Sequence, residues 1–175
     1  MDSTALRALQ APLKDRYRAD PSTALITLKA QGSLENEGIA CKVQTGRAIA
    51  AVAGLHPATG GSGLELCSGD MLLEALVACA GVTLKSVATA IDVPLKSGHV
   101  TAEGDLDFRG TLGVDKEAPV GFAAIRLRFE VETDAPQERL DQLLKLTERY
   151  CVVYQTIRNG PAVKVTLQRA DTAAI

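Results

Sequence analysis

Residues 68–91 carry the sequence SGDMLLEALVACAGVTLKSVATAI, which is apolar on nearly every side when wound as a helix. Ser68 suits an N-cap, Asp70 places a negative charge in the first turn, and Pro94 follows as a stop signal. A helix that is apolar all round normally lies inside a protein. The charged residues of this stretch and its short unbroken apolar runs argue against a bilayer span. The sequence therefore predicts one long buried helix.

Two runs of alternating apolar and polar residues follow this helix, as expected of strands with one buried and one exposed face. In the first run, residues 100–108, the polar positions include Glu103 and Asp105. In the second run, residues 125–132, they include Arg126 and Arg128. If the two strands are antiparallel neighbours, the acidic row faces the arginines, and these pairs would help to fix the register.

A second helix and a final strand are predicted in the C-terminal part. The sequence DAP at residues 134–136 begins the helix, and NGP at residues 159–161 ends it. Residues 163–167, VKVTL, predict the closing strand. Five side chains of the helix fall at helical spacing and are expected to face the core: Leu140, Leu143, Leu144, Thr147 and Cys151.

The N-terminal part is expected to hold an arm and three short strands. Residues 1–21 are polar and helix-prone and form the arm. Residues 23–28 and 39–52 are β-prone, and residues 32–38 look like a hairpin loop between them. The glycine-rich residues 54–63 predict a mobile loop without regular structure. The order of three strands, helix, two strands, helix and strand indicates an α+β fold, with two main helices packed on antiparallel β-sheet.

The composition of this 175-residue chain argues against several classes of function. A net charge of -2 offers no basic surface for nucleic acid or an anionic membrane. The N-terminus lacks a signal-peptide pattern, so we expect a cytoplasmic protein with reduced thiols. No Cys-x-x-Cys pair occurs, and His56 and His99 are far from any cysteine in sequence. Neither a metal site, nor a cofactor, nor a Cys-His hydrolase is expected.

Cys79 and Cys151 are the candidate reactive groups, because they fall on core-facing positions of the two predicted helices. Free cysteine is among the most buried residue types, so inert packing is the alternative interpretation of each. Cys41 and Cys67 lie in strand and loop contexts without charged neighbours, and we interpret both as incidental.

Both candidate cysteines lie in segments that resemble motifs of the OsmC/Ohr family. Residues 68–81, SGDMLLEALVACAG, are similar to its central helix, in which an acidic residue begins a Leu/Ala-rich helix that leads to the first cysteine. Residues 146–156, LTERYCVVYQT, resemble its second-cysteine motif. The resemblance covers roughly residues 25–167, and it implies an OsmC-like domain at 22–170 followed by a tail at 171–175.

This resemblance implies a thiol-dependent peroxidase that reduces organic hydroperoxides or hydrogen peroxide in oxidative-stress defence. Cys79 would be the peroxidatic thiolate, which is oxidised to a sulfenic acid. Cys151 would be the resolving thiol that forms a disulfide with it, and an external dithiol would reduce that disulfide. The resemblance also implies an intertwined homodimer.

The family uses an arginine to hold the thiolate, and the best match to it is Arg47, paired with an acid that corresponds to Asp70. A buried thiol has a raised pKa and is a poor nucleophile, so it needs a cation nearby. The guanidinium group is suited to this role because it stays charged and can bind a carboxylate and a thiolate together. Lys85 is the alternative cation, and Glu74 is the alternative carboxylate. A solvated strand residue is the alternative interpretation of Arg47.

Three positions depart from the family pattern. Asp70 replaces the usual Glu, Val152 follows the second cysteine where many members have Pro, and Glu148 stands where some have His. These differences indicate a divergent branch, and they bear on substrate and rate more than on fold.

The spacing of Asp70 and Cys79 predicts an oligomer. Nine residues along one helix correspond to about 14 Å and half a turn out of phase, so the two residues cannot meet within one copy. Two helices packed about a two-fold axis can bring them together.

Two other functions stay open: a dimer that binds a small hydrophobic ligand, and a redox sensor whose disulfide alters a partner interface.

Overall fold

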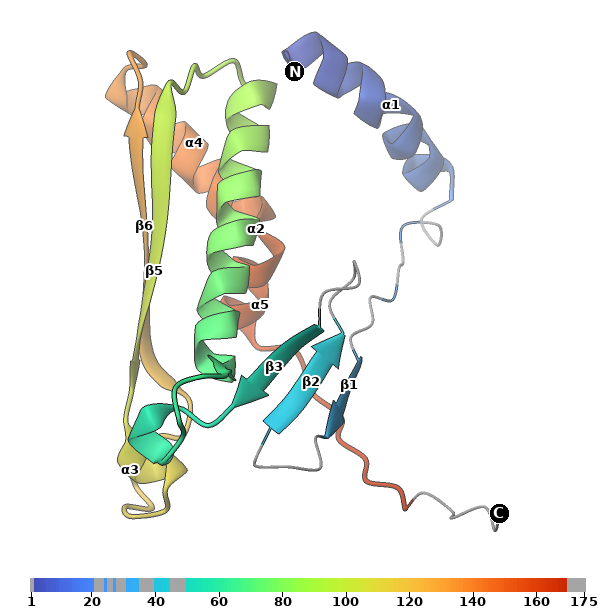
Figure 1. Ribbon diagram of the computed structural model, residues 1–175. Coiled ribbons are helices and arrows are strands. Elements are labelled where there is room, and N and C mark those ends of the chain that lie inside the picture. Colours follow the sequence, from blue (N-terminus) through green and yellow to red (C-terminus); the bar gives the residue numbers. More distant parts are fainter. Residues whose placement is uncertain are drawn as a thin grey trace.

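The fold is organised around α2 (Ser68–Ala90), the long central helix of Figure 1. The strands β5 (Ser97–Leu106) and β6 (Phe122–Glu132) form an antiparallel ribbon along one side of this helix. The helices α4 (Gln137–Tyr150) and α5 (Val152–Asn159) both pack against α2. The expected α+β fold with two main helical segments is therefore confirmed.

The structure, a computed structural model, describes residues 2–20, 24, 27, 31–34, 40–44 and 50–169. Within this part, α1 (Ser3–Ala19) forms the helical N-terminal arm, which contacts α2. Arg7 anchors the arm, since its guanidinium lies 3.7 Å from the carboxylate of Asp92 just beyond the end of α2. The helical character expected of residues 1–21 is thus present over most of that stretch.

A four-stranded sheet in the order β1-β2-β3-β4 lies before α2. The strands β1 (Gln31–Leu34), β2 (Ala40–Gln44) and β3 (Ala50–Gly54) are antiparallel neighbours, and β4 (Leu66–Cys67) pairs in parallel with β3. The expected hairpin loop at residues 32–38 is therefore wrong in part, because β1 occupies its first half and pairs with β2. Most of residues 23–28 lie outside the described residues.

The glycine-rich residues 54–63 contain regular structure that the sequence did not predict. A short 3-10 helix, η2 (Pro57–Thr59), is capped by His56, whose Nδ1 accepts the N–H of Ala58 at 3.0 Å. Gly60 ends it in the left-handed region at φ 91°, a conformation that glycine adopts without a Cβ penalty. The ring of His56 also stacks on that of Phe108, with 4.9 Å between centroids.

The long helix begins and ends close to the predicted positions. Its N-cap is Cys67 rather than Ser68, because residue 67 still has the extended backbone of β4, and no side chain caps the first turn. The helix closes where the N–H of Val93 bonds the carbonyl of Ala88 at 2.8 Å. One face of α2 supplies its buried side chains: Leu76, Ala80, Leu84, Val87 and Ala88.

The register of the ribbon agrees with the expected charge pairing at Arg126, whereas Arg128 lies opposite Thr101 and forms an ion pair with Glu130 of its own strand. Glu103 lies opposite Arg126 in the ladder, and the guanidinium of Arg126 also bonds Asp105 at 2.8 Å. Both pairs lie on the exposed face, so they specify alignment more than they stabilise the fold. Gly104 permits the ring of Phe122 to fold over β5, since a Cβ at residue 104 would overlap that ring.

The predicted second helix is interrupted at Cys151, which corrects the expectation of one continuous helix. Cys151 has an extended backbone (φ -73°, ψ 107°), and it is at once the C-cap of α4 and the N-cap of α5. Its side chain is 1% exposed, and Leu143 and Thr147 are buried with it, as the helical spacing predicted. Leu144 was expected in the same stripe but is 44% exposed.

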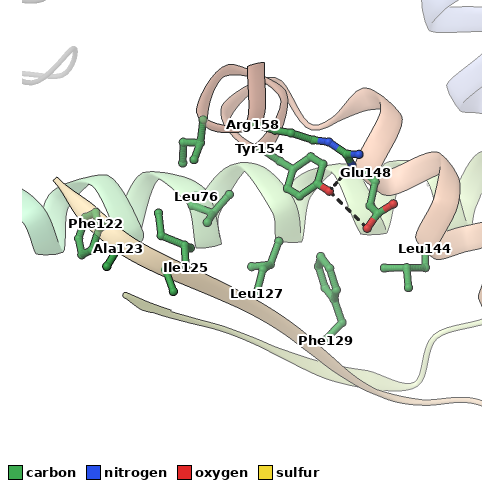
Figure 2. A pocket seen from close by; sticks show the side chains of 12 residues that line it. Leu76, Phe122, Ala123, Ile125, Leu127, Phe129, Leu144, Glu148, Tyr154 and Arg158 are labelled. Carbon is green, nitrogen blue, oxygen red and sulfur yellow. Dashed lines mark hydrogen bonds between the residues drawn. The ribbon is translucent and has the colours of Figure 1, made fainter. Parts of the chain in front are cut away.

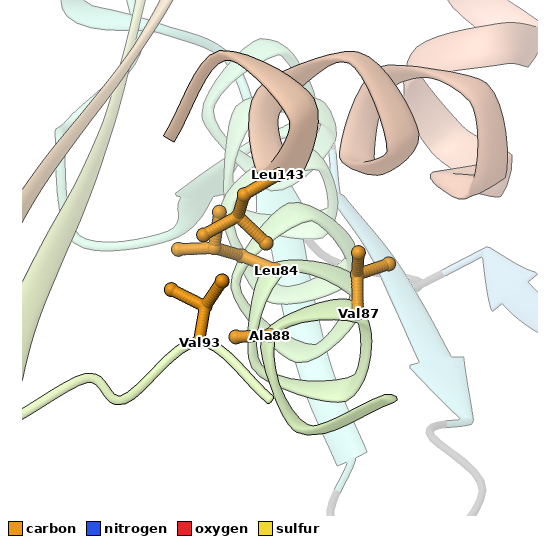
Figure 3. Packing of buried hydrophobic residues seen from close by; sticks show 5 residues of the cluster. All are labelled: Leu84, Val87, Ala88, Val93 and Leu143. Carbon is orange, nitrogen blue, oxygen red and sulfur yellow. The ribbon is translucent and has the colours of Figure 1, made fainter. Parts of the chain in front are cut away.

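The hydrophobic core lies where the C-terminal half of α2 meets α4. Figure 3 shows its cluster, in which Leu143 of α4 packs among three residues of α2 and Val93, all of them at most 9% exposed: Leu84, Val87, Ala88, Val93 and Leu143. By length and composition alone α2 is also apolar enough to cross a membrane. β5, α4 and α5 pack against it, but only 28% of its most apolar 18-residue window is buried, so the prediction of one long buried helix holds only in part.

The predicted closing strand at residues 163–167 is wrong for this structure. Residues 160–169 have no regular structure, and Val163, Val165 and Leu167 are 80%, 85% and 100% exposed. A strand needs a neighbour to accept and donate its backbone hydrogen bonds. Within the described part of the chain, no strand pairs with this segment.

Candidate thiol site

The structure brings Cys79 and Cys151 together from two elements that are distant in sequence. Cys79 lies on α2 and is half-buried, and Cys151 lies fully buried at the junction between α4 and α5. Because both of these helices pack on α2, the junction faces the helix at Cys79. The two side chains are hydrogen-bonded to each other, with the Cys151 thiol as donor to the Cys79 sulfur.

The interruption at Cys151 supplies hydrogen-bond donors to this pair. The first backbone bond of α5 runs from the N–H of Gln155 to the carbonyl of Cys151 at 2.9 Å, so the preceding amides lie before the first intrahelical bond. The N–H groups of Val152 and Val153 donate to the Cys79 sulfur. The N–H of Tyr154 donates to the Cys151 sulfur. A helix N-terminus oriented in this way favours a negative charge at the sulfur.

The pKa of the Cys79 thiol lies below its ordinary value as a result. Burial raises the pKa, but hydrogen bonds from the Val153 amide, the Cys151 thiol, the Val152 amide and the Thr83 hydroxyl together outweigh that effect. A cysteine at a helix N-terminus often has a lowered pKa for the same electrostatic reason. Here the helix that contributes the donors is α5, while the cysteine belongs to α2.

The pKa of the Cys151 thiol is shifted in the opposite direction. Burial raises it most, and the neighbouring Cys79 raises it further, whereas the Tyr154 amide lowers it. The pair therefore has unequal members, with the thiolate favoured at Cys79 and the thiol at Cys151. Such a pair can present one nucleophile and keep its neighbour protonated.

Of the other predicted site residues, Asp70 and Lys85 lie in the described part of the chain and are not among the groups that bond to this pair. Asp70 is exposed in the first turn of α2, beside a hollow that is also lined by Glu74 and Ala102. Lys85 is exposed on α2 and is not among the groups that bond to Cys79. Arg47 lies outside the described residues.

Sequence reasoning missed the donors that surround Cys79. It named a charged side chain, Arg47, which lies outside the described residues, whereas the described groups that lower the pKa of Cys79 are two main-chain amides, the Cys151 thiol and the Thr83 hydroxyl. The position of Thr83, four residues after Cys79 on the same helix, was visible in the sequence. The amides were not, because they depend on the interruption of the second helix at Cys151.

A cavity of about 460 Å³ lies between β6, α2 and the α4–α5 pair, as Figure 2 shows. Its walls are mostly apolar, with Leu76 from α2 and a row from β6: Phe122, Ala123, Ala124, Ile125, Leu127 and Phe129. Tyr154 and Arg158 add polar groups, since the guanidinium of Arg158 donates to the tyrosine oxygen at 2.9 Å. Leu76 lies one turn before Cys79, so the cavity adjoins the thiol pair, although neither cysteine belongs to its described lining.

Among the described residues, no group of three or more His, Cys, Asp or Glu side chains is arranged to hold a metal ion. Cys67, at the N-cap of α2, is half-buried and its sulfur lies next to Gly69. Cys41 lies in β2. The described thiol chemistry is therefore concentrated at Cys79 and Cys151.

Comparison with known structures finds the same fold at low sequence identity. An OsmC-like protein from Mycoplasma pneumoniae has a TM-score of 0.63 and 14% identity, over 77% of this chain and 89% of that chain. An organic hydroperoxide resistance protein OsmC from Legionella pneumophila has a TM-score of 0.59 and 18% identity, over 77% and 90%. One from Elizabethkingia anophelis has a TM-score of 0.60 and 15% identity, over 78% and 91%. At such identities the likeness establishes the fold alone.

The family assignment comes from the sequence of the domain itself. No curated protein matches the chain. A family model described as OsmC-like protein matches residues 60–166, which is more than half of the chain and includes Cys79 and Cys151. With this match and the shared fold, the chain belongs to the OsmC-like protein family.

Proposed function

We propose that this protein is a thiol-dependent peroxidase that reduces organic hydroperoxides. The observation that carries the proposal is the contact between two thiols of unequal pKa, lowered at Cys79 and raised at Cys151. A peroxidase of this kind needs one thiolate to attack and a second thiol within reach to resolve the product. The pair on α2 and at the α4–α5 junction meets both requirements.

In the proposed reaction, the Cys79 thiolate attacks one peroxide oxygen and the O–O bond breaks. The leaving alkoxide takes up a proton to become an alcohol, and Cys79 is oxidised by two electrons to a sulfenic acid. Cys151 then loses its proton and attacks the Cys79 sulfur, which forms the disulfide and releases water. An external dithiol returns both cysteines to the reduced state by thiol–disulfide exchange.

The preference for an organic peroxide rests on the apolar cavity beside the site. Its row of β6 side chains and Leu76 offers a dry surface for an alkyl or aryl group, which hydrogen peroxide cannot use. Two of the solved structures with this fold are named organic hydroperoxide resistance proteins. That name agrees with the proposed substrate class.

The test is turnover of cumene hydroperoxide and of hydrogen peroxide with dithiothreitol as the reductant. We expect turnover by the parent with preference for the organic peroxide, complete loss in Cys79→Ser, and a single oxidation without recycling in Cys151→Ser. Peptide mapping after one equivalent of peroxide should find a disulfide between residues 79 and 151. Cys67→Ser is the matched control and should behave like the parent. Absence of turnover in the parent, or a dominant disulfide through Cys67, would contradict the proposal.

Binding of a small hydrophobic ligand without catalysis is the second candidate function. It is favoured by one observation, namely that the described lining of the cavity includes neither cysteine. A fluorescent apolar probe would then bind equally well to the parent and to Cys79→Ser, and neither protein would consume peroxide. Peroxide turnover by the parent that is lost in Cys79→Ser decides for the peroxidase.

A further inference from the structure

The cavity beside the thiol pair has an apolar wall that the described part of the chain leaves partly uncovered. Ile125, Leu127 and Phe129 occupy alternate positions of β6 on the face that lines the cavity, as Figure 2 shows. Each of them is only half-buried, although the inward face of an antiparallel ribbon normally packs on the core. The volume of about 460 Å³ is that of a small-molecule site. This wall is therefore suited to the apolar part of a ligand.

Three polar side chains line the helical side of the same cavity, namely Glu148 of α4 and Tyr154 and Arg158 of α5. Tyr154 and Arg158 are four residues apart and so lie on one face of α5. The guanidinium of Arg158 donates to the tyrosine oxygen at 2.9 Å, and its carbon lies 5.9 Å from the centroid of the tyrosine ring. The tyrosine hydroxyl in turn donates to a carboxylate oxygen of Glu148 at 3.5 Å. An aromatic residue thus holds the guanidinium at the cavity.

Arg158 keeps most of its binding capacity free. A guanidinium has five N–H donors, and the bond to Tyr154 uses one of them. Arg158 takes part in none of the ion pairs in the described part of the chain. It is exposed, whereas Glu148 is half-buried behind the tyrosine hydroxyl. A head group that arrives from solvent therefore meets the cation, and a guanidinium binds a carboxylate through two parallel hydrogen bonds.

We propose that this cavity binds a fatty-acid type of ligand, with the acyl chain against β6 and the carboxylate held by Arg158. Arg158 is then the residue that determines specificity for an anionic head group, and Tyr154 is a positioning residue that orients it. The inference deepens the proposed function and rests on it in one respect, since it makes the peroxide substrate one that carries a carboxylate. Binding of the acid itself requires no peroxide.

The test compares decanoate with uncharged decanol as competitors of the neutral fluorescent probe phenylnaphthylamine near neutral pH, on reduced full-length protein. Arg158→Gln removes the charge, Arg158→Lys keeps it, and Tyr154→Phe removes the hydroxyl that holds the guanidinium. Arg149→Gln is the matched control. Arg149 is also an exposed arginine beside a tyrosine, 5.7 Å from the ring centroid of Tyr150, and it is not part of the cavity lining.

We expect Arg158→Gln to weaken the binding of decanoate about tenfold, a change of about 1.4 kcal/mol, and to leave that of decanol unchanged. Tyr154→Phe should weaken decanoate by less, while Arg158→Lys should keep most of the affinity and Arg149→Gln should follow the parent. Added salt should weaken decanoate in the parent more than in Arg158→Gln, because it screens the charge. Hexanoate should bind more weakly than decanoate throughout, because it buries a shorter chain.

Three results would overturn the proposal. In the first, neither ligand displaces the probe, as expected if a second copy of the chain fills the cavity. In the second, decanoate binds equally well to Arg158→Gln and to Arg149→Gln. In the third, decylamine binds and is lost in Glu148→Gln while decanoate is indifferent to Arg158→Gln, which assigns a cationic ligand instead. The affinity for decanol, measured in the same samples, reports whether each variant keeps its fold.

The two proposals fail in distinguishable ways. If the parent reduces no peroxide but decanoate binding depends on Arg158, the peroxidase function is wrong and the carboxylate site stands. If the parent reduces cumene hydroperoxide but decanoate binding is indifferent to Arg158, the carboxylate site is wrong and the peroxidase stands.

Discussion

At the scale of single residues, Cys79 and Cys151 have the same chemistry but different surroundings. Cys79 receives the amides at the start of α5, whereas Cys151 is buried more deeply and adjoins the sulfur that carries the charge. Hydrogen bonds to the charged form of a group lower an acid's pKa, and burial raises it. The proposed assignment of nucleophile and resolving thiol therefore has a physical basis in this chain, independent of the order of the cysteines.

The unequal pKa values predict how the two thiols react with pH. Because the pKa of Cys79 is lowered, its thiolate forms as pH rises through a value below the usual 8.5 or so. Because the pKa of Cys151 is raised, its thiolate forms only at a higher pH than usual. Peptide-resolved alkylation at pH 7, a condition about 1.5 units below the usual pKa, should therefore modify Cys79 first. Faster modification of Cys151 would contradict this prediction.

Arg47 provides a second test of what activates Cys79. The family resemblance implies that its charge stabilises the thiolate, whereas the described donors are uncharged, namely two amides, the Cys151 thiol and a hydroxyl. If the charge of Arg47 does stabilise the thiolate, Arg47→Met should lower the alkylation rate of Cys79 near neutral pH, with partial recovery as pH rises. Arg109→Met, which removes an exposed guanidinium bound to Asp107, is the control. If Arg47→Met reacts like the parent at every pH, the α5 amides and Thr83 suffice.

At the scale of elements, the contact between α2 and α4 holds the site together. Leu143 is 2% exposed in the core cluster, and its helix leads directly into Cys151. The same contact therefore contributes to the stability of the domain and holds the second thiol, Cys151, in position.

Truncation of this contact has a predictable cost. Leu143→Ala should lower the free energy of unfolding by about 2–5 kcal/mol, because it leaves a cavity among Leu84, Val87, Ala88 and Val93. Leu144→Ala is the matched control, since Leu144 is 44% exposed, and it should cost about 1 kcal/mol or less. Urea unfolding followed by circular dichroism, at one protein concentration, measures both. Equal losses in the two variants would contradict the assigned core.

At the scale of the whole molecule, one chain leaves much of its longest apolar helix uncovered. Only 28% of the most apolar 18-residue window of α2 is buried. Leu72, Ala75, Ala78 and Val82 form an exposed stripe at helical spacing, with Val82 72% exposed. Exposed apolar faces of this kind commonly mark an interface. We propose that a second copy covers this stripe, as the expected intertwined homodimer requires.

Light scattering in dilute buffer tests the dimer. The parent should have twice the chain mass of 18.4 kDa. Val82→Glu should shift the protein toward the monomer, because it places a charge in the apolar interface. Val114→Glu, at a loop position that is 74% exposed, should leave the mass unchanged. A monomeric parent would refute the proposal.

The sequence by itself determined the elements whose periodicity is local. The apolar run of α2 and the alternation of β5 and β6 each identify a helix or strand, because side-chain direction repeats every 3.6 or 2 residues within the element. The expected meeting of the acidic row with the arginines likewise occurs at Arg126, although not at Arg128. These features depend on neighbours along one segment or on one adjacent strand.

Only the tertiary structure decided the surroundings of the reactive thiol. The sequence keeps its helical spacing through Cys151, yet the helix is interrupted there. The amides that the interruption leaves free of intrahelical bonds reach Cys79 only because α5 packs on α2. The failure of residues 163–167 to form a strand has the same origin, since pairing depends on which sheet edge is near. Every residue except proline carries the same main-chain N–H donor, so a local pattern of residues cannot show which amide will lie at a distant sulfur. The packing of the elements decides that.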